Sequence, residues 1–107
     1  MVASIAVEVN ALDGAAGPAA LLAVAADPNR LAVLQVLAGG TTCVCRLQEQ
    51  IPIAPNLLSY HLKVLREAGL ISAARRGRWI DYSLNDSALQ RLHAALPAVP
   101  VDEPSPR

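Results

Sequence analysis

The sequence predicts a mainly α-helical fold with one small β-hairpin. Hydrophobic residues make up 53% of the 107 residues, but aromatic residues make up only 3% and Phe is absent. The core must therefore consist of Ala, Leu, Val and Ile side chains, a composition that favours helices. Apolar residues recur at helical intervals along most of the chain, and only residues 70–84 alternate as strands do. A chain of this length has room for one small domain.

The two ends differ from the predicted domain, which covers residues 18–96. Residues 1–17 are small and apolar without a clear period, and we expect a flexible arm. Residues 97–107 hold four of the eight prolines, and we expect a disordered tail. No apolar run approaches the roughly 20 residues that span a bilayer. The first residues lack the basic segment of a signal peptide, so we expect a cytoplasmic protein.

Three helices are predicted in the first half of the domain. The first begins at Pro18, a residue that suits a first helical turn. The second begins at Pro28 with Asp27 as its cap, and Gly39-Gly40 ends it. The third follows Thr41-Thr42, either of which can cap it. Their apolar faces are expected to be Leu21, Leu22 and Ala25, then Leu31, Leu34 and Leu37, then Val44, Leu47 and Ile51.

A fourth helix with two contrasting faces is predicted from Pro55 to Ala68. At about 100° per residue, Leu58, Leu62 and Leu65 gather on one side. The opposite side carries Asn56, Tyr60, Lys63 and Glu67. One face can therefore pack against a core while the other presents hydrogen-bonding groups.

The hairpin consists of two short runs, residues 70–74 and 78–84, joined through Arg75-Arg76-Gly77. Its tip is therefore rich in arginine. Asn85 or Asp86 caps a last helix, whose apolar face is expected to be Leu89, Leu92 and Leu96.

The charge distribution singles out one part of the chain. The formal net charge is zero, but residues 54–80 carry +4, which leaves −4 for the remainder. A basic face of this kind suits phosphates. Two short helices, a turn, a polar-faced helix and a basic hairpin together form a winged helix-turn-helix, which places a helix in the major groove of DNA.

The predicted interface with DNA includes both the fourth helix and the hairpin. The residues expected to face DNA are Asn56, Ser59, Tyr60 and Lys63 on the helix and Arg75, Arg76 and Arg78 on the hairpin. Asn56 is the best candidate for reading a base, because an amide can pair bidentately with adenine. The alternative is a solvent-facing amphipathic helix followed by a charged turn.

Three other large side chains on these elements are expected to have structural roles. His61 flanks the apolar stripe, and we expect it to pack or hydrogen bond against the neighbouring helix. Trp79 and Tyr82 are expected to anchor the hairpin to the core, because a small domain needs its few large residues there.

The two cysteines, Cys43 and Cys45, are separated by one residue. A disulfide between such close neighbours would connect no distant segments, so metal ligands or redox groups are the expected roles. If both lie in the first turn of the third helix, their side chains point about 160° apart. Binding one ion would then require that turn to unwind, and Ile51-Pro52-Ile53 would pass the change to the fourth helix.

Several segments in the right order resemble the ArsR/SmtB family of metal-responsive repressors, over roughly residues 18–96. Cys43-Val44-Cys45 looks like the effector motif of the arsenic-sensing and the cadmium/lead-sensing branches. The resemblance implies a homodimer held by its first and last helices, an inverted-repeat operator, and release when a toxic metal binds. It implies no constitutive cofactor. The segments are Asp27-Pro28-Asn29-Arg30-Leu31, Leu58-Ser59-Tyr60-His61-Leu62-Lys63-Val64-Leu65-Arg66-Glu67-Ala68-Gly69-Leu70-Ile71 and Arg76-Gly77-Arg78-Trp79-Ile80-Asp81-Tyr82-Ser83-Leu84.

The effector expected at Cys43 and Cys45 is a thiophilic ion, because soft thiolates select As(III), Sb(III), Cd(II) or Pb(II). The arsenic-sensing branch often has a third cysteine where this chain has Gln48, and the cadmium/lead branch takes cysteines from an N-terminal arm that here has none. A third ligand would be water, a small thiol, or an oxygen of Glu8 or Asp13. Two thiols favour As(III) or Sb(III), with Cd(II) and Pb(II) as alternatives.

Other functions are weighed against this one. The family's zinc, nickel or cobalt site on the last helix is not expected, because His93 stands there alone. An enzyme is not expected, since the sequence lacks both a βαβ pattern around the thiols and a set of catalytic residues. A thiol redox-sensing regulator on the same fold is the main alternative. A winged helix that binds only proteins would not need the arginine cluster.

Overall fold

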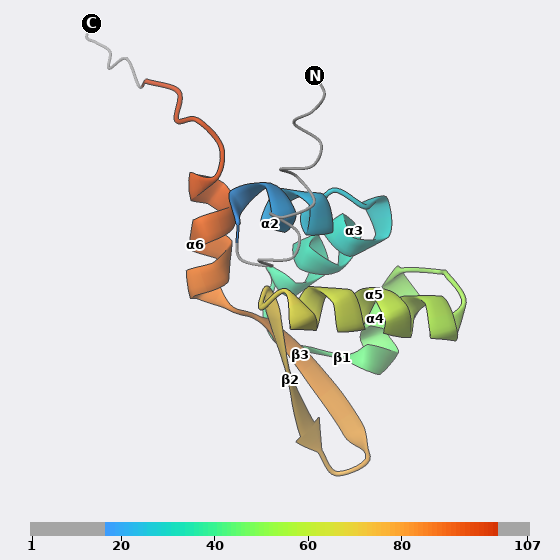
Figure 1. The fold of residues 1–107 in the computed structure, drawn as a ribbon. Helices are drawn as coiled ribbons and strands as arrows, with labels where there is room; N and C mark the ends of the chain where they lie inside the picture. Colours follow the sequence, from blue (N-terminus) through green and yellow to red (C-terminus); the bar gives the residue numbers. More distant parts are fainter. Residues whose placement is uncertain (1–16, 101–107) are drawn as a thin grey trace, which may run out of the picture.

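The computed structural model describes residues 17–100 and shows a helical body with a projecting hairpin (Figure 1). The mainly α-helical fold with a wing is confirmed. The described helices are α2 (Pro18–Ala25), α3 (Pro28–Leu37), α4 (Val44–Gln50), α5 (Pro55–Glu67) and α6 (Asp86–Ala94). The described strands are β1 (Thr42–Cys43), β2 (Ile71–Arg76) and β3 (Trp79–Leu84). They form an antiparallel sheet in the order β1-β3-β2. β1 was not predicted, and it adds a third strand to the wing.

The corner between α2 and α3 has the predicted cap. The Asp27 carboxylate accepts hydrogen bonds from the backbone N–H groups of Asn29 at 2.7 Å and Arg30 at 3.1 Å. These bonds satisfy two donors that the first turn of a helix leaves unpaired. The bond from the Arg30 N–H is the main reason why the pKa of Asp27 is lowered.

A single hydrophobic core joins the helical body to the base of the wing. The predicted apolar faces of α4 and α5 are confirmed, with Leu47 and Leu58 almost fully buried. On α3 the prediction for Leu31 was wrong, because this side chain is 44% exposed and Val33 is buried in its place. The core consists of Leu21, Val33, Leu34, Leu37, Leu47, Ile51, Leu58, Leu62, Leu65, Leu70, Ile71, Tyr82 and Ala88.

The two aromatic side chains of the wing have different environments. Tyr82 is 6% exposed and belongs to the core, as predicted. Trp79 is 45% exposed, so the expectation that it anchors the wing was wrong. Trp79 pairs with Arg76 at the outer end of the hairpin, next to the turn at Gly77, whereas Tyr82 pairs with Ala73 nearer the helices. The hairpin projects from the body, and none of the helices described within residues 17–100 lies against its outer end (Figure 1).

Asn85 precedes α6, but its side chain does not cap that helix. Its amide nitrogen donates to the Gly69 carbonyl at 2.8 Å, and its amide oxygen accepts from the Ser72 hydroxyl. The side chain therefore joins the end of α5 to β2. Gly69 has a φ of 82°, a left-handed conformation that glycine adopts without strain and that ends α5.

The expected flexible arm and disordered tail lie mostly outside the described residues. Within residues 97–100 there is no helix or strand. No single helix in the described part of the chain is long and apolar enough to cross a membrane. Only α2 and α3 together, across a bend of 91°, have that length and composition.

The cap at Asp27 leads to a prediction about stability and pH. Because the folded pKa is lowered, the carboxylate stabilises the fold above the unfolded pKa of about 3.9, and this contribution is lost as the pH falls through the folded value. Asp27→Ala should lower the melting temperature at pH 7 by several degrees, and the difference from the wild type should shrink at acid pH. Thermal melts followed by circular dichroism measure both.

Two further variants serve as controls for this prediction. Asp27→Asn keeps an acceptor for the N–H groups and should melt near the wild type at pH 7. Asp86→Ala removes an exposed carboxylate from the first turn of α6 and should have a smaller effect. If Asp27→Ala melted like the wild type at pH 7, the cap would have no role in stability.

Candidate nucleic-acid interface and cysteine site

The predicted recognition face of α5 is exposed. Its apolar stripe packs into the core, which leaves the opposite side of the helix open to solvent. Tyr60 is 56% exposed, and the other predicted contact residues of the helix are exposed as well. These are Asn56, Ser59 and Lys63. The helix therefore presents amide, hydroxyl, phenol and ammonium groups on one accessible side.

His61 fixes α5 against the corner between α2 and α3, and its predicted packing role is confirmed. The ring is 5% exposed, and its Nδ1 lies 3.1 Å from Nη1 of Arg30. An arginine can only donate, so Nδ1 accepts. Nε2 lies 3.9 Å from the carboxylate of Asp27, and Nε of Arg30 donates to the Val24 carbonyl at 2.6 Å. Asp27, which caps α3, and His61 of α5 thus belong to one polar cluster.

The three arginines of the wing are exposed, as the predicted interface requires. Arg76 is also held by a carboxylate that the sequence analysis did not single out. Its Nε donates to Oδ2 of Asp81 at 2.7 Å and its Nη2 donates to Oδ1 at 3.1 Å. This bidentate ion pair lowers the pKa of Asp81 and raises the pKa of Arg76. The sequence places Asp81 on the strand opposite Arg76 in the predicted hairpin, and this position was the signal that could have revealed the ion pair.

The cysteine site begins on a strand and not inside a helix. Cys43 is the N-cap of α4, with extended φ and ψ of −77° and 157°. The expectation that Thr41 or Thr42 caps this helix was wrong, because Thr42 pairs with Tyr82 of β3 and its hydroxyl donates to the Gly40 carbonyl. Cross-strand pairing of Thr42 and Cys43 with β3 holds them outside the helix.

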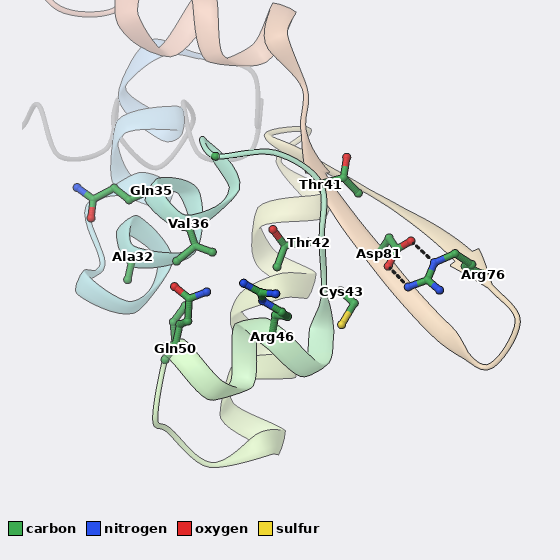
Figure 2. A pocket seen from close by; sticks show the side chains of 12 residues that line it. Ala32, Gln35, Val36, Thr41, Thr42, Cys43, Arg46, Gln50, Arg76 and Asp81 are labelled. Carbon is green, nitrogen blue, oxygen red and sulfur yellow. Dashed lines mark hydrogen bonds and ion pairs between the residues drawn. The ribbon is translucent and has the colours of Figure 1, made fainter.

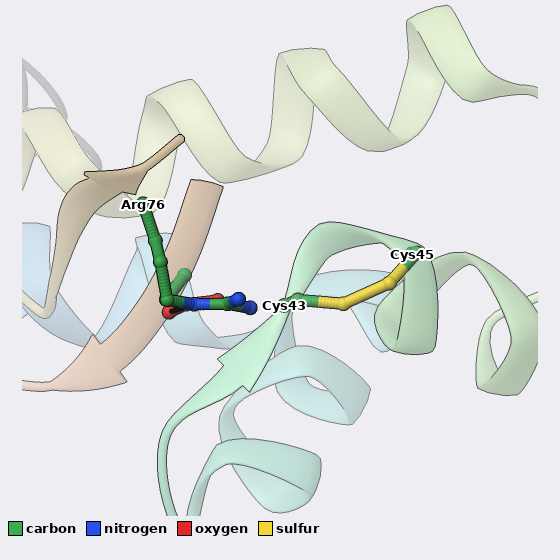
Figure 3. The surroundings of a disulfide bond; sticks show 4 residues. Cys43, Cys45 and Arg76 are labelled. Atoms are coloured by element: carbon green, nitrogen blue, oxygen red, sulfur yellow. Dashed lines mark hydrogen bonds and ion pairs between the residues drawn. A yellow bond between two sulfur atoms is a disulfide. The ribbon is translucent and has the colours of Figure 1, made fainter. Parts of the chain in front are cut away.

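The two cysteines form a disulfide, with Cα atoms 5.4 Å apart (Figure 3). Two expectations from the sequence are therefore wrong: that such close neighbours remain unbridged, and that their side chains point to opposite sides. Both errors have one cause, since Cys43 is extended while Cys45 is in the first turn of α4. The side chains converge without any unwinding of the helix, so both sulfurs can reach one ion after reduction.

The described residues offer no complete metal site. No group of three or more His, Cys, Asp or Glu side chains among them is placed to hold an ion. Gln48, at the position of the missing third cysteine, donates to the carbonyl of Ile53 at 2.7 Å and secures the turn between α4 and α5. Glu8 and Asp13 lie outside the described residues. His93 is exposed on α6.

An open cavity of about 880 Å³ lies between α3, α4 and the wing (Figure 2). Its lining includes Cys43, Arg46 and Gln50 on one side and the pair of Arg76 and Asp81 on the other. The cysteine site and the ion pair of the wing therefore border the same space.

A short structural path connects Cys43 to the wing. Cys43 pairs with Asp81 across β1 and β3, and Asp81 holds Arg76 of β2. Arg76 in turn pairs with Trp79 at the end of the hairpin. Only strand β3 therefore lies between Cys43 and Arg76, an arginine of the predicted DNA interface.

Comparisons with known proteins indicate the family of this chain. A family model described as "Bacterial regulatory protein, arsR family" matches residues 27–73. The arsenical resistance operon repressor of Bacillus subtilis is 43% identical over 68 residues, which are 63% of this chain and 65% of that protein. The protein of the same name from Staphylococcus xylosus is 33% identical over 76 residues, covering 71% of this chain and 73% of that protein.

A solved structure shows the same fold. The crystal structure of a possible transcriptional regulator for arsenical resistance is 38% identical and superposes with a TM-score of 0.67. The superposition covers 69% of this chain and 77% of that chain.

Proposed function

The chain belongs to the arsR family of bacterial regulatory proteins, and we propose that it is a transcriptional repressor that binds operator DNA and is released by a thiophilic metal or metalloid. The observation that carries the proposal is the accessible polar side of α5 beside three exposed arginines of the wing. A helix of this kind enters the major groove, while the arginines reach phosphates or the minor groove.

The proposed form on DNA is a homodimer. A two-fold dimer presents two recognition helices about one helical turn apart, which suits an inverted repeat. α2 and α6 pack against each other in the described chain. Leu96, after the end of α6, is 58% exposed. These two helices are the proposed dimer surface.

The proposed effector is As(III) or Sb(III), bound by Cys43 and Cys45 after reduction of their disulfide. Thiolate sulfur suits soft ions, and the convergence of the two side chains supports a shared ion. The relatives from Bacillus subtilis and Staphylococcus xylosus are both named arsenical resistance operon repressors, which favours arsenic. Cd(II) and Pb(II) are alternatives for the same thiols. The third ligand would come from water, a small thiol, or Glu8 or Asp13.

A redox-sensing regulator is the second candidate, and the disulfide is the observation that favours it. In that function peroxide would take two electrons and two protons from the two thiols, leaving the disulfide and two molecules of water. A small thiol would reverse the change. Both candidates use the same DNA interface and differ only in the effector.

A metal titration separates the metal-sensing function from the redox-sensing function. Reduced protein titrated without oxygen with arsenite, antimonite, cadmium or lead should give a sulfur-to-metal ultraviolet band that saturates near one ion per chain. Cys43→Ser should abolish the band, because one thiolate cannot hold the ion alone. Gln48→Ala should keep it, since that amide belongs to the turn before α5. Absence of a band with all four ions, together with loss of DNA binding on peroxide addition, would establish the redox function instead.

The proposed coupling between effector and DNA runs through the wing. A change of bonding at Cys43 would displace β1 against β3, where the Asp81 carboxylate holds Arg76. The ion would thereby favour a state with poorer phosphate contacts. The turn Ile51-Pro52-Ile53, which leads directly into α5, is the alternative path.

Asp81→Asn tests the path through the wing. The metal band should be unchanged, while the loss of DNA affinity on metal addition should be smaller than in the wild type. Asp86→Asn makes the same charge change on α6 and should respond to metal like the wild type. DNA affinity would be measured by anisotropy of a labelled duplex. An undiminished response in Asp81→Asn would assign the coupling to the turn before α5.

The two parts of the DNA interface should respond differently to mutation. Arg75→Ala with Arg76→Ala should weaken binding to every duplex and reduce the slope of log affinity against log salt by up to about two. Asn56→Ala should change the preferred sequence and leave that slope nearly constant. Binding titrations at several salt concentrations, with the number of chains per duplex, measure both. Identical effects on slope and preference would mean that these roles are wrongly assigned.

A further inference from the structure

We propose that Trp79 is a non-ionic DNA contact of the wing, whose indole packs against the sugars of the DNA backbone. The inference rests on the proposed function, because it assumes that the wing meets DNA. It adds an aromatic residue to an interface otherwise described through polar and charged side chains.

The position of Trp79 is unusual for the chain's single tryptophan. A core without Phe gains most from large aromatic side chains, and Tyr82 on the same strand is 6% exposed. Trp79 nevertheless remains 45% exposed at the outer end of the hairpin. Its large apolar surface is available there for an external partner.

The charges around Trp79 indicate the chemistry of that partner. Arg76 is its cross-strand partner, Arg78 precedes it, and Arg75 lies one residue before Arg76. Directly paired residues lie on the same face of a hairpin. Asp81, the acidic residue of the hairpin, is already engaged by Arg76. An apolar ring with one arginine on its own face and two more at neighbouring positions of the hairpin complements a polyanion that also has apolar surfaces.

DNA has this combination of surfaces. Deoxyribose rings lie between the phosphates and offer apolar surface. Proteins that bind the minor groove combine apolar side chains with arginines. The indole can cover a sugar while neighbouring guanidinium groups contact phosphates. The phosphate contacts release counterions and depend on salt, whereas the packing of Trp79 does not.

The test uses the full chain and a random-sequence duplex of roughly 30 base pairs at low salt, because a backbone contact needs no operator. With one tryptophan, emission reports Trp79 alone. It should change on DNA addition and saturate together with the anisotropy of the labelled duplex. Trp79→Ala should weaken binding about tenfold with an unchanged salt slope, Trp79→Phe should weaken it less, and Arg76→Ala should lower the slope by about one.

Each outcome of this test has a separate meaning. Unchanged emission and unchanged affinity of Trp79→Ala, in a protein that binds DNA, would overturn the inference and leave the proposed function standing. No DNA binding by the wild type would overturn the proposed function. Emission that changes with protein concentration alone would show that a second copy covers Trp79, against the inference. Circular dichroism and melting of both Trp79 variants should match the wild type, since the side chain lies outside the core.

Discussion

The pairing of a two-residue strand with the inner strand of the wing determines how the rest of the site is arranged. Thr42 and Cys43 pair with Tyr82 and Asp81, which holds Cys43 in an extended conformation just before α4. The same pairing brings the two sulfurs together in a disulfide and places Cys43 beside the ion pair of the wing. The proposed effector site and the wing part of the proposed DNA interface therefore lie on the same sheet, so a structural change at Cys43 has a short path to Arg76.

A second constraint fixes α5, the proposed recognition helix. The apolar stripe of α5 supplies packing, but stripes of leucine tolerate small rotations and shifts. The buried His61 ring fixes the rotation and position of α5, because its hydrogen bond to Arg30 has a defined geometry. Arg30 is also bound to the Val24 carbonyl, and Asp27 caps the helix that carries Arg30. The orientation of α5 thus depends on a polar cluster at the corner between α2 and α3.

The disulfide between Cys43 and Cys45 encloses a very short segment, which is compatible with both proposed effectors. Its ring closes between residues two positions apart, so the disulfide constrains little of the unfolded chain. Because this disulfide contributes little to the free energy of unfolding, it can form and break without unfolding the domain. This property suits a pair of thiols that exchange between oxidised, reduced and ion-bound forms.

Local patterns in the sequence determined most of the elements. The spacing of Leu58, Leu62 and Leu65 predicted the buried side of α5, and Asp27 followed by Pro28 predicted the start of α3, because both signals act over a few residues. Tertiary structure alone decided the position of Cys43 and the exposure of Trp79. The pairing of Cys43 with Asp81 joins residues far apart in the chain, and this pairing overrides a local helical pattern only when the wing is in place. Whether an aromatic side chain such as Trp79 is buried depends on what packs against it, and none of the described helices covers the outer end of the hairpin.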